Sequence, residues 1–399
     1  MHRTLPVLLL ALVPALASAQ ATDASRALAQ EAVIVDTHID APGMLMDGWM
    51  DLGEEAKGRE FDYPKALAGG LDVAFMSIYT SPRQDDDGSA WQAANEMIDS
   101  VEALAQRHPD RFALLVSPGD VDELRRGDRV LLPLGMENGA PLGDDLANVQ
   151  FFFDRGVRYI TLAHSAANAI ADSSYALERK WHGLSPFGKR VVAEMNRLGI
   201  MVDVSHLSDE SAAEAIALST VPVIASHSAF RHFTPDFERN ISDELAKAIA
   251  DKGGVVQVPF GTAFVNPESA ADTQAHFRAI NDFNKRNAEL KAAGEPLQDR
   301  DAFDKAWAQA HPPRQTPIEA VLDQIDYGVK LVGIDHVGIG SDFDGVGGEL
   351  PAGLRTVADF PNLVAGLQAR GYDDDAIARI LGGNLLRTWA AIEAGAAAH

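Results

Sequence analysis

Apolar runs recur along the chain in a regular rhythm, and helix-type patterns separate several of them. Eight runs are candidate strands, at residues 32–38, 71–79, 130–137, 157–163, 200–205, 221–226, 254–260 and 336–341. Each run is almost continuously apolar rather than alternating, which is typical of parallel strands that are buried on both faces. The pattern therefore predicts a parallel sheet whose strands are joined by helices.

Three of the predicted helices have clear end signals. Residues 185–199 place a proline near the helix start and finish on a glycine. Residues 208–219 and 242–254 each open with a serine followed by carboxylates in the first turn. Eight strand–helix units of this kind favour a (β/α)8 TIM-type barrel, and a doubly wound open sheet is the main alternative.

Residues 262–316 interrupt this rhythm between the seventh and eighth strands. The segment is polar, rich in Ala, Asp, Lys and Asn, and mostly compatible with a helix. We expect a helical insertion here, which would serve as a lid, an oligomer contact or an elaborated loop. The predicted organisation is a single barrel domain over residues 20–399 with this insertion at about 262–316.

The first nineteen residues have a different character. A short basic start, an apolar stretch and the tripeptide Ala17-Ser18-Ala19 predict a secretory signal peptide, cleaved before Gln20; an uncleaved membrane anchor is the alternative. The chain has no cysteine, so disulfides and cysteine acylation are excluded. Its formal net charge of −24 disfavours binding to nucleic acid. We therefore expect an exported protein, periplasmic or secreted, without a stable membrane anchor.

Residues that commonly bind metals recur where the predicted strands end. They are His38, Asp40, Glu137, His164, His206 and His227, and the last strand is followed by Asp342 and Asp344. In a barrel the carboxyl ends of all strands share one face, whereas an open sheet would spread them along a wide edge. Imidazole nitrogen and carboxylate oxygen together suit Zn²⁺. The arrangement predicts one metal centre built from many strands.

Two of these pairs have informative spacing. His38 and Asp40 are two residues apart, so an extended backbone aims both side chains at the same face. His206 and His227 end consecutive strands in the similar contexts DVSH and ASHS, so both can bind one ion.

Glu137 ends a buried strand, where an unpaired carboxylate is costly. A metal, or two metals bridged by both carboxylate oxygens, would supply a partner, and a salt bridge to Arg158 is the alternative. Two metals roughly 4 Å apart can share a hydroxide and polarise a carbonyl. The sequence contains neither a G-x-S-x-G motif nor a cysteine nucleophile, so metal-activated water is the best-supported hydrolytic chemistry.

The remaining strand-end residues have open roles. His164 is either a further metal ligand or a group that stabilises an oxyanion. Asp342 can accept a proton from an activated water, and Asp344 is two residues further on and is expected to face the same way. The sequence pattern alone therefore divides the proton-transfer role between the two aspartates.

Together the motifs DTHID, GMENG, YITLAHS, DVSH, ASHS and HVGIGSDFDG resemble those of the membrane (renal) dipeptidase family, metallopeptidase family M19 of the amidohydrolase superfamily. The resemblance runs from about residue 32 to 390. It implies a (β/α)8 barrel with two zinc ions. It also implies that His38 and Asp40 hold one zinc, that His206 and His227 hold the other, and that Glu137 bridges them.

The same resemblance implies three further roles. His164 would contact the substrate and steady the tetrahedral intermediate, and Asp342 would shuttle the proton. Arg239, in the segment ERNISDEL, would grip the substrate carboxylate, with Arg231 as a nearby rival.

The expected function is therefore an exported zinc-dependent dipeptidase that hydrolyses L,L and also L,D dipeptides with a metal-bridging hydroxide. The first alternative is a related binuclear amidohydrolase that acts on N-acyl amino acids, lactones or β-lactams. The second is a non-catalytic metal-dependent binding protein. A requirement for a free substrate carboxylate would favour the dipeptidase. The missing cysteines argue against a disulfide-linked dimer, and a homodimer of another kind stays open.

Overall fold

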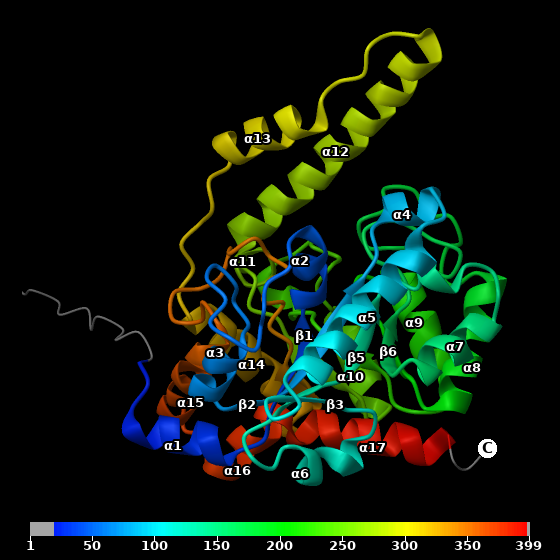
Figure 1. Cartoon of the computed structure of the whole chain (residues 1–399). Coiled ribbons are helices and arrows are strands. Elements are labelled where there is room, and N and C mark those ends of the chain that lie inside the picture. The colour runs from blue at the N-terminus through cyan, green and yellow to red at the C-terminus, as the bar shows by residue number, and fades with distance from the viewer. Residues whose placement is uncertain (1–19, 397–399) are drawn as a thin grey trace, which may run out of the picture.

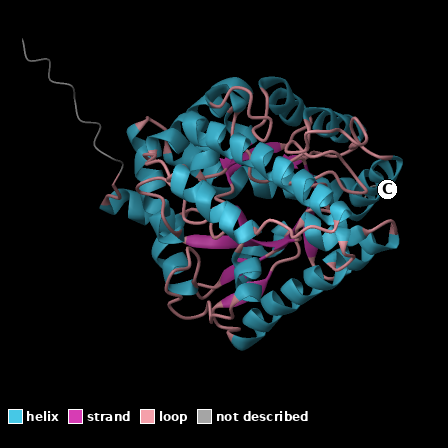
Figure 2. Cartoon of the chain, turned by 90° about the horizontal axis from the view of Figure 1, so that it is seen from above, coloured by secondary structure: helices cyan, strands magenta, loops and turns pink. Residues whose placement is uncertain are grey.

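A parallel sheet surrounded by helices forms the centre of the protein (Figures 1 and 2). The computed structural model describes residues 20–396, and the predicted signal peptide lies outside them. The strands of the described chain are β1 (Ile34–Ile39), β2 (Leu71–Tyr79), β3 (Phe112–Leu114), β4 (Val130–Leu132), β5 (Leu134–Glu137), β6 (Val157–Thr161), β7 (Met201–Asp203), β8 (Ile224–Ala225), β9 (Val255–Val258) and β10 (Val337–Ile339).

The sheet closes on itself as the sequence predicts. Its order is β10-β9-β8-β7-β6-β5-β2-β4-β3, with β1 paired to β2. The first and last strands meet through a parallel bridge between Ile39 and Phe343. Two backbone hydrogen bonds reinforce this seam, from Asp40 N to Phe343 O (2.9 Å) and from Asp342 N to His38 O (3.0 Å). The (β/α)8 barrel is therefore confirmed, and all eight predicted strand positions are occupied.

The third predicted strand differs in detail from the expected continuous run. Pro133 lacks a backbone N–H and divides this strand into β4 and β5, while its carbonyl accepts a hydrogen bond from Met76 N at 2.8 Å. β5 continues around the barrel between β2 and β6. β4 pairs with β2 on one side and with β3 on the other, and β3 is a short strand that was not among the eight predicted.

Helices cover the outside and the two ends of the barrel (Figures 1 and 2). They are α1 (Asp23–Glu31), α2 (Ala41–Asp47), α3 (Tyr63–Gly69), α4 (Pro82–Asp86), α5 (Ala90–Arg107), α6 (Val121–Leu124), α7 (Ala147–Asp154), α8 (Pro186–Leu198), α9 (Asp209–Leu218), α10 (Asp243–Asp251), α14 (Glu319–Val332), α15 (Phe360–Ala369), α16 (Asp374–Ala378) and α17 (Asn384–Ala396). The three helices with clear end signals are α8, α9 and α10. Ser185, Ser208 and Ser242 cap their N-termini through side-chain oxygens. No helix within residues 20–396 is long and apolar enough to cross a membrane.

The inside of the barrel is filled from below by aromatic side chains. α17 runs beneath the strands (Figure 1) and contributes Trp389, whose ring centroid lies 5.4 Å from that of Phe75. Phe75 in turn lies 5.5 Å from Tyr159, and all three side chains are buried. Tyr159 fits because Gly135 on the neighbouring strand has no side chain. These rings form the apolar floor beneath the strand ends.

The insertion is helical and lies between β9 and β10, as predicted. It comprises α11 (Thr262–Val265), α12 (Pro267–Ala293) and α13 (Arg300–Ala310). In Figure 1, α12 and α13 stand above the barrel. Phe283 packs on Phe303 at 4.8 Å and His276 stacks on Trp307 at 4.8 Å, so apolar contacts hold the two helices together.

Candidate metal centre and substrate pocket

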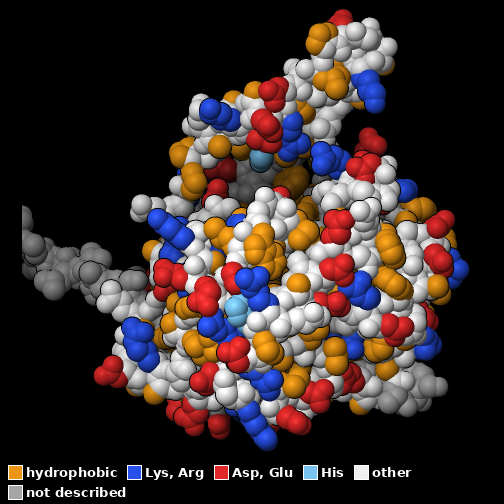
Figure 3. All heavy atoms as spheres, in the orientation of Figure 1, with side chains coloured by type: hydrophobic (Ala, Val, Ile, Leu, Met, Phe, Trp, Pro, Cys, Tyr) orange, Lys and Arg blue, Asp and Glu red, His pale blue; other side chains and the backbone are white. Residues whose placement is uncertain are grey.

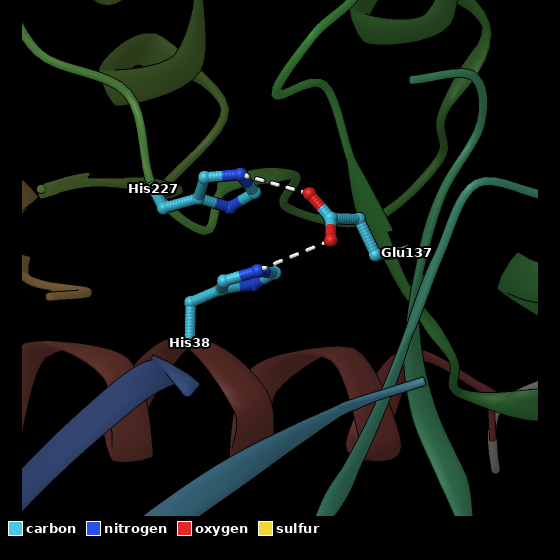
Figure 4. Close-up of side chains that lie close together, drawn as sticks. All are labelled: His38, Glu137 and His227. Atoms are coloured by element: carbon cyan, nitrogen blue, oxygen red, sulfur yellow. Dashed lines mark ion pairs between the residues drawn. The ribbon is translucent and has the colours of Figure 1, made fainter. Parts of the chain in front are cut away.

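Glu137, the last residue of β5, faces His38 and His227 with its two carboxylate oxygens (Figure 4). Its Oε2 atom is 3.4 Å from His38 Nε2, and its Oε1 atom is 3.3 Å from His227 Nε2. These histidines come from distant parts of the sequence and meet because β1 and β8 both end on this face. Each carboxylate oxygen therefore faces a different histidine.

Two further histidines surround Oε1 of Glu137. His206 Nε2 lies 3.1 Å from this oxygen, and His164 Nε2 lies 3.4 Å from it. The Nε2 atoms of His206 and His227 are only 2.9 Å apart. Four imidazoles thus direct nitrogen atoms at one carboxylate, which is the grouping that the strand-end pattern predicted.

Asp40 and Asp342 complete the other side of the cluster. His38 Nε2 lies 3.5 Å from Asp40 Oδ2, and ligand atoms of His38, Asp40 and Asp342 all lie within 4.8 Å of one another. A Cβ atom at Gly345 would approach Asp40 Oδ2 to 2.1 Å and Asp342 Oδ1 to 2.5 Å. Glycine at position 345 therefore leaves room for the two carboxylates.

The donor set fits divalent metal ions. Three overlapping groups place their ligand atoms within 4.8 Å of one another, namely His38, Glu137 and His227; Glu137, His164 and His206; and His38, Asp40 and Asp342. His38 Nε2 is fully buried and has no hydrogen-bond partner among the described residues. A buried nitrogen without a partner is costly, and a bound cation would use its lone pair. Glu137 and His38 each belong to two of the groups, but of these two only Glu137 has two oxygen atoms, one for each of two ions, as a bridging ligand needs.

Electrostatics at the centre favour the metal-binding forms of His206, His227 and Glu137. For His38, the effect of burial, which lowers the pKa, is instead outweighed by Tyr159, Glu137 and Asp40, so that the pKa is raised. Burial, together with nearby positive charge such as that of Arg239, holds the pKa values of His206 and His227 well below the usual range. Burial opposes ionisation of Glu137, but His38 and His164 outweigh it and lower the pKa of that carboxyl. Neutral imidazole and ionised carboxylate are the forms that coordinate metals.

Two ligand histidines are oriented by groups behind them. Tyr159 OH lies 2.7 Å from His38 Nδ1, and Ser226 Oγ lies 2.8 Å from His227 Nδ1. Ser226 Oγ in turn donates to Asp203 Oδ2 at 2.6 Å. These bonds leave both Nε2 atoms directed at the centre. Tyr159 and Asp203 were not among the predicted site residues. Both are polar residues within otherwise apolar strands, and this feature of the sequence could have identified them.

The turns after the strands hold several residues in an uncommon backbone conformation. His206 and Asp342 both have a φ of 66°, and Asn138 has a φ of 76°. Positive φ is disfavoured for residues with a side chain and persists where the surroundings enforce it. The side chains at these turns are therefore directed by local backbone geometry rather than by strand alternation.

Arg239, and not Arg231, reaches the centre. Arg239 is 2% exposed and donates to Ser228 Oγ at 2.7 Å and to His227 O at 2.8 Å. No carboxylate within residues 20–396 forms an ion pair with it. Arg231 is instead paired with Asp209 through Nη1 at 2.7 Å. Arg239 Nη2 also lies 2.9 Å from His206 Nε2, and the buried Nε atom of Arg239 has no hydrogen-bond partner among residues 20–396, so the guanidinium keeps an unused donor beside the cluster.

Asp344 and Arg158 form their hydrogen bonds with groups outside the cluster, although Asp344 also lines the pocket. Asp344 accepts hydrogen bonds from Glu60 N (2.9 Å) and Phe61 N (3.2 Å), so its carboxylate serves a neighbouring loop. Arg158 donates to the carbonyl of Val116 at 2.6 Å and forms no ion pair with the carboxylate of β5. The alternative partner for Glu137, a salt bridge to Arg158, is therefore not formed.

A pocket of about 620 Å³ opens above the centre. Glu137, His164, His206 and Asp342 line its inner end, and the insertion contributes residues to its wall. The surface is hollowed below the insertion (Figure 3). A space of this size accommodates a small molecule such as a dipeptide beside the candidate metal site.

Comparisons with known proteins agree with this geometry. Residues 22–399 match the family described as membrane dipeptidase (Peptidase family M19). The chain is 27% identical over 345 residues to dipeptidase tcpJ of Claviceps purpurea, covering 85% of this chain and 70% of that protein. It is also similar to the crystal structure of the probable dipeptidase PvdM from Pseudomonas aeruginosa, with a TM-score of 0.78, 28% identity and coverage of 93% and 98% of the two chains.

The fold is shared with a more distant solved structure. A metallo peptidase from Rhodobacter sphaeroides, liganded with a phosphinate mimic of the dipeptide L-Ala-D-Ala, has a TM-score of 0.72 at 24% identity, covering 90% of this chain and 99% of that one. Because the family match spans almost the whole described chain and agrees with the metal-ligating cluster, the protein belongs to the membrane dipeptidase family, peptidase family M19, and is a metallodipeptidase.

Proposed function

We propose that this metallodipeptidase uses two zinc ions bridged by Glu137 to hydrolyse dipeptides with a free α-carboxylate, including L,D dipeptides. One observation supports this assignment above the others. Four histidine nitrogens converge on the two oxygens of Glu137, and a buried arginine without a carboxylate lies next to them. His38 and Asp40 would hold one ion, and His206 and His227 the other.

The protein's own groups have distinct tasks in this proposal. Arg239 binds the substrate carboxylate and so fixes the distance of the scissile bond from Glu137. His164 faces the pocket and stabilises the charge that develops on the carbonyl oxygen. Asp342 receives a proton and passes it to the leaving amine. Burial, followed by the charge of Asp40, raises the pKa of Asp342, which suits a group that must hold a proton transiently. When bound, the metal ions would lower the pKa of water and polarise the carbonyl.

Metal dependence and substrate class are tested together. The enzyme is stripped with a chelator, reloaded with zinc and assayed against L-Ala-L-Ala, L-Ala-D-Ala and N-acetyl-L-Ala. We expect hydrolysis of both dipeptides only after zinc is restored, with two zinc ions per chain by elemental analysis. Full activity in the stripped enzyme would refute metal dependence, and faster hydrolysis of the N-acyl amino acid would favour a related amidohydrolase activity instead.

The role of Arg239 is tested with paired substrates. The wild-type enzyme should strongly prefer L-Ala-L-Ala to L-Ala-L-Ala amide, because the amide has no carboxylate for the guanidinium. In Arg239→Met this preference should fall by about a hundredfold, which corresponds to loss of a charge-assisted hydrogen bond. Arg190→Met, on the exposed side of α8, serves as the matched control and should retain the preference. An unchanged preference in Arg239→Met would refute the carboxylate clamp.

Export is the remaining part of the proposal and rests on the character of residues 1–19. We expect the mature protein to begin at Gln20 when the gene is expressed with its own leader. N-terminal sequencing of the purified protein tests this, and a chain that retains residues 1–19 would contradict it.

A further inference from the structure

The insertion contributes an aromatic side chain to the pocket wall. Phe277 of α12 lines the pocket and stacks on Tyr175, with ring centroids 3.9 Å apart and an interplanar angle of 17°. Tyr175 also lines the pocket, and its ring lies 6.0 Å from that of His206. A continuous aromatic surface thus leads from the candidate metal centre to the insertion.

This surface lies beside the proposed carboxylate clamp. The guanidinium of Arg239 lies over the ring of Phe264, 4.9 Å from its centroid, and Phe264 lines the same pocket. The side chain of Asn240 donates to the carbonyl of Phe264 at 2.8 Å, which ties the start of the insertion to the loop of Arg239. We define Tyr175, Phe264 and Phe277 as the aromatic wall.

The position of the wall determines which part of a dipeptide it meets. In a dipeptide, the C-terminal side chain and the α-carboxylate branch from the same carbon atom. A carboxylate on Arg239 therefore places that side chain within a few ångströms of the guanidinium, which is where the wall lies. Aromatic faces favour apolar groups and, because they carry partial negative charge, disfavour carboxylates.

We propose that Phe277 is a specificity-determining residue and that the aromatic wall selects dipeptides with an apolar C-terminal side chain. The inference rests on the proposed function. The insertion thereby contributes to the active site, because Phe277 is the residue of α12 that lines the pocket. Residues of α2 and α5 also line the pocket; they include flexible methionines (Met44, Met46, Met97) and acidic side chains (Asp47, Glu96) but no aromatic ring.

The test compares substrates that differ only at the C-terminal side chain. The ratio of kcat/KM for L-Ala-L-Leu to that for L-Ala-Gly is measured for the wild type, Phe277→Ala, Phe277→Tyr and Phe283→Ala. Phe283 is on the same helix but packs against Phe303 and does not line the pocket, so it is the matched control.

We expect the ratio to fall about tenfold in Phe277→Ala, mainly through KM, because one wall of an apolar site is lost. Phe277→Tyr keeps the ring and should restore the ratio, and Phe283→Ala should keep the wild-type value. An unchanged ratio in Phe277→Ala, or an equal fall in Phe283→Ala, would overturn the inference while leaving the dipeptidase assignment intact. A wild-type enzyme that hydrolyses neither dipeptide would overturn both.

Discussion

Replacing Gly135 with alanine should damage the metal centre from beneath. The added Cβ atom would lie 1.9 Å from Cζ of Tyr159 and 2.2 Å from its Cε1 atom. Carbon atoms in contact are normally about 3.5–4.0 Å apart, so the ring must retreat by about 1.5 Å or more. It has little room, because Phe75 packs below it and its hydroxyl bonds to His38 Nδ1 at 2.7 Å.

The expected cost has two parts. Overpacking a buried site costs about 1–3 kcal/mol, and the lost hydrogen bond adds about 1 kcal/mol, so we expect a loss of roughly 2–4 kcal/mol in unfolding free energy. Displacing the phenol also frees the ring of His38 to rotate. Loss of such an orienting partner typically lowers metal affinity by about 10–100-fold.

Guanidinium unfolding of the zinc-free protein measures the first effect, and competition with a chromophoric chelator measures the second. Tyr159→Phe removes only the hydroxyl and should weaken zinc binding with a smaller loss of stability. Gly48→Ala is a control, since a Cβ there meets nothing within 4 Å. A Gly135→Ala protein that unfolds within about 0.5 kcal/mol of the wild type and keeps its zinc affinity would refute this reasoning.

Three further outcomes are expected. Asp342→Asn should lower kcat by about a hundredfold or more, because proton transfer is lost. In Asp344→Asn, kcat should stay near the wild-type value, because the Asp344 carboxylate bonds to a loop instead. Steady-state kinetics measure both, and full turnover in Asp342→Asn would exclude the proton role. Arg231→Met removes hydrogen bonds to the carbonyls of residues 238 and 240, which flank Arg239. KM should therefore rise about tenfold with a smaller change in kcat, and an unaltered KM would exclude a role of Arg231 in positioning Arg239. Burial, with the nearby charge of Asp344, raises the pKa of Glu60 to about 7. At a pH between the usual pKa of a glutamate and about 7, the folded state therefore binds more protons than the unfolded state. Stability should therefore fall by about 1–2 kcal/mol, after allowance for solvent screening, as the pH rises through that window, and Glu60→Gln should flatten the decline in unfolding midpoints.

Much of the barrel and of the metal cluster could be predicted because both depend on local pattern. Buried parallel strands are continuously apolar, and the polar residues that follow them share one face of a barrel. His38, Glu137, His206 and His227 were therefore recognisable from their positions after such runs, and the structure brings their side chains together. The caps of α8, α9 and α10 are equally local, since a serine side chain bonds to an amide two or three residues away.

The features that could not be predicted depend on contacts between distant segments. Asp342 and Asp344 are two residues apart and were expected to face the same way, but both have a positive φ, so strand alternation does not apply there. Arg239 and Arg231 lie outside the regular strands, where no periodicity ranks them. Tyr159 bonds to a residue 121 positions away, and Phe277 reaches the pocket from an insertion whose pattern showed only that it is helical.

The seam of the barrel has a consequence for how the protein is made. Thr37 and Ile339, which hydrogen-bond across it, are 302 positions apart in the chain. A growing polypeptide that has not yet reached β10 already contains every histidine of the centre, yet it lacks the strand that fixes His38 and Asp40 in place. Closing so long a loop is slow, because its entropy is lost before the contacts form. Tight metal binding should therefore be among the last events of folding, after nearly the whole chain has been synthesised.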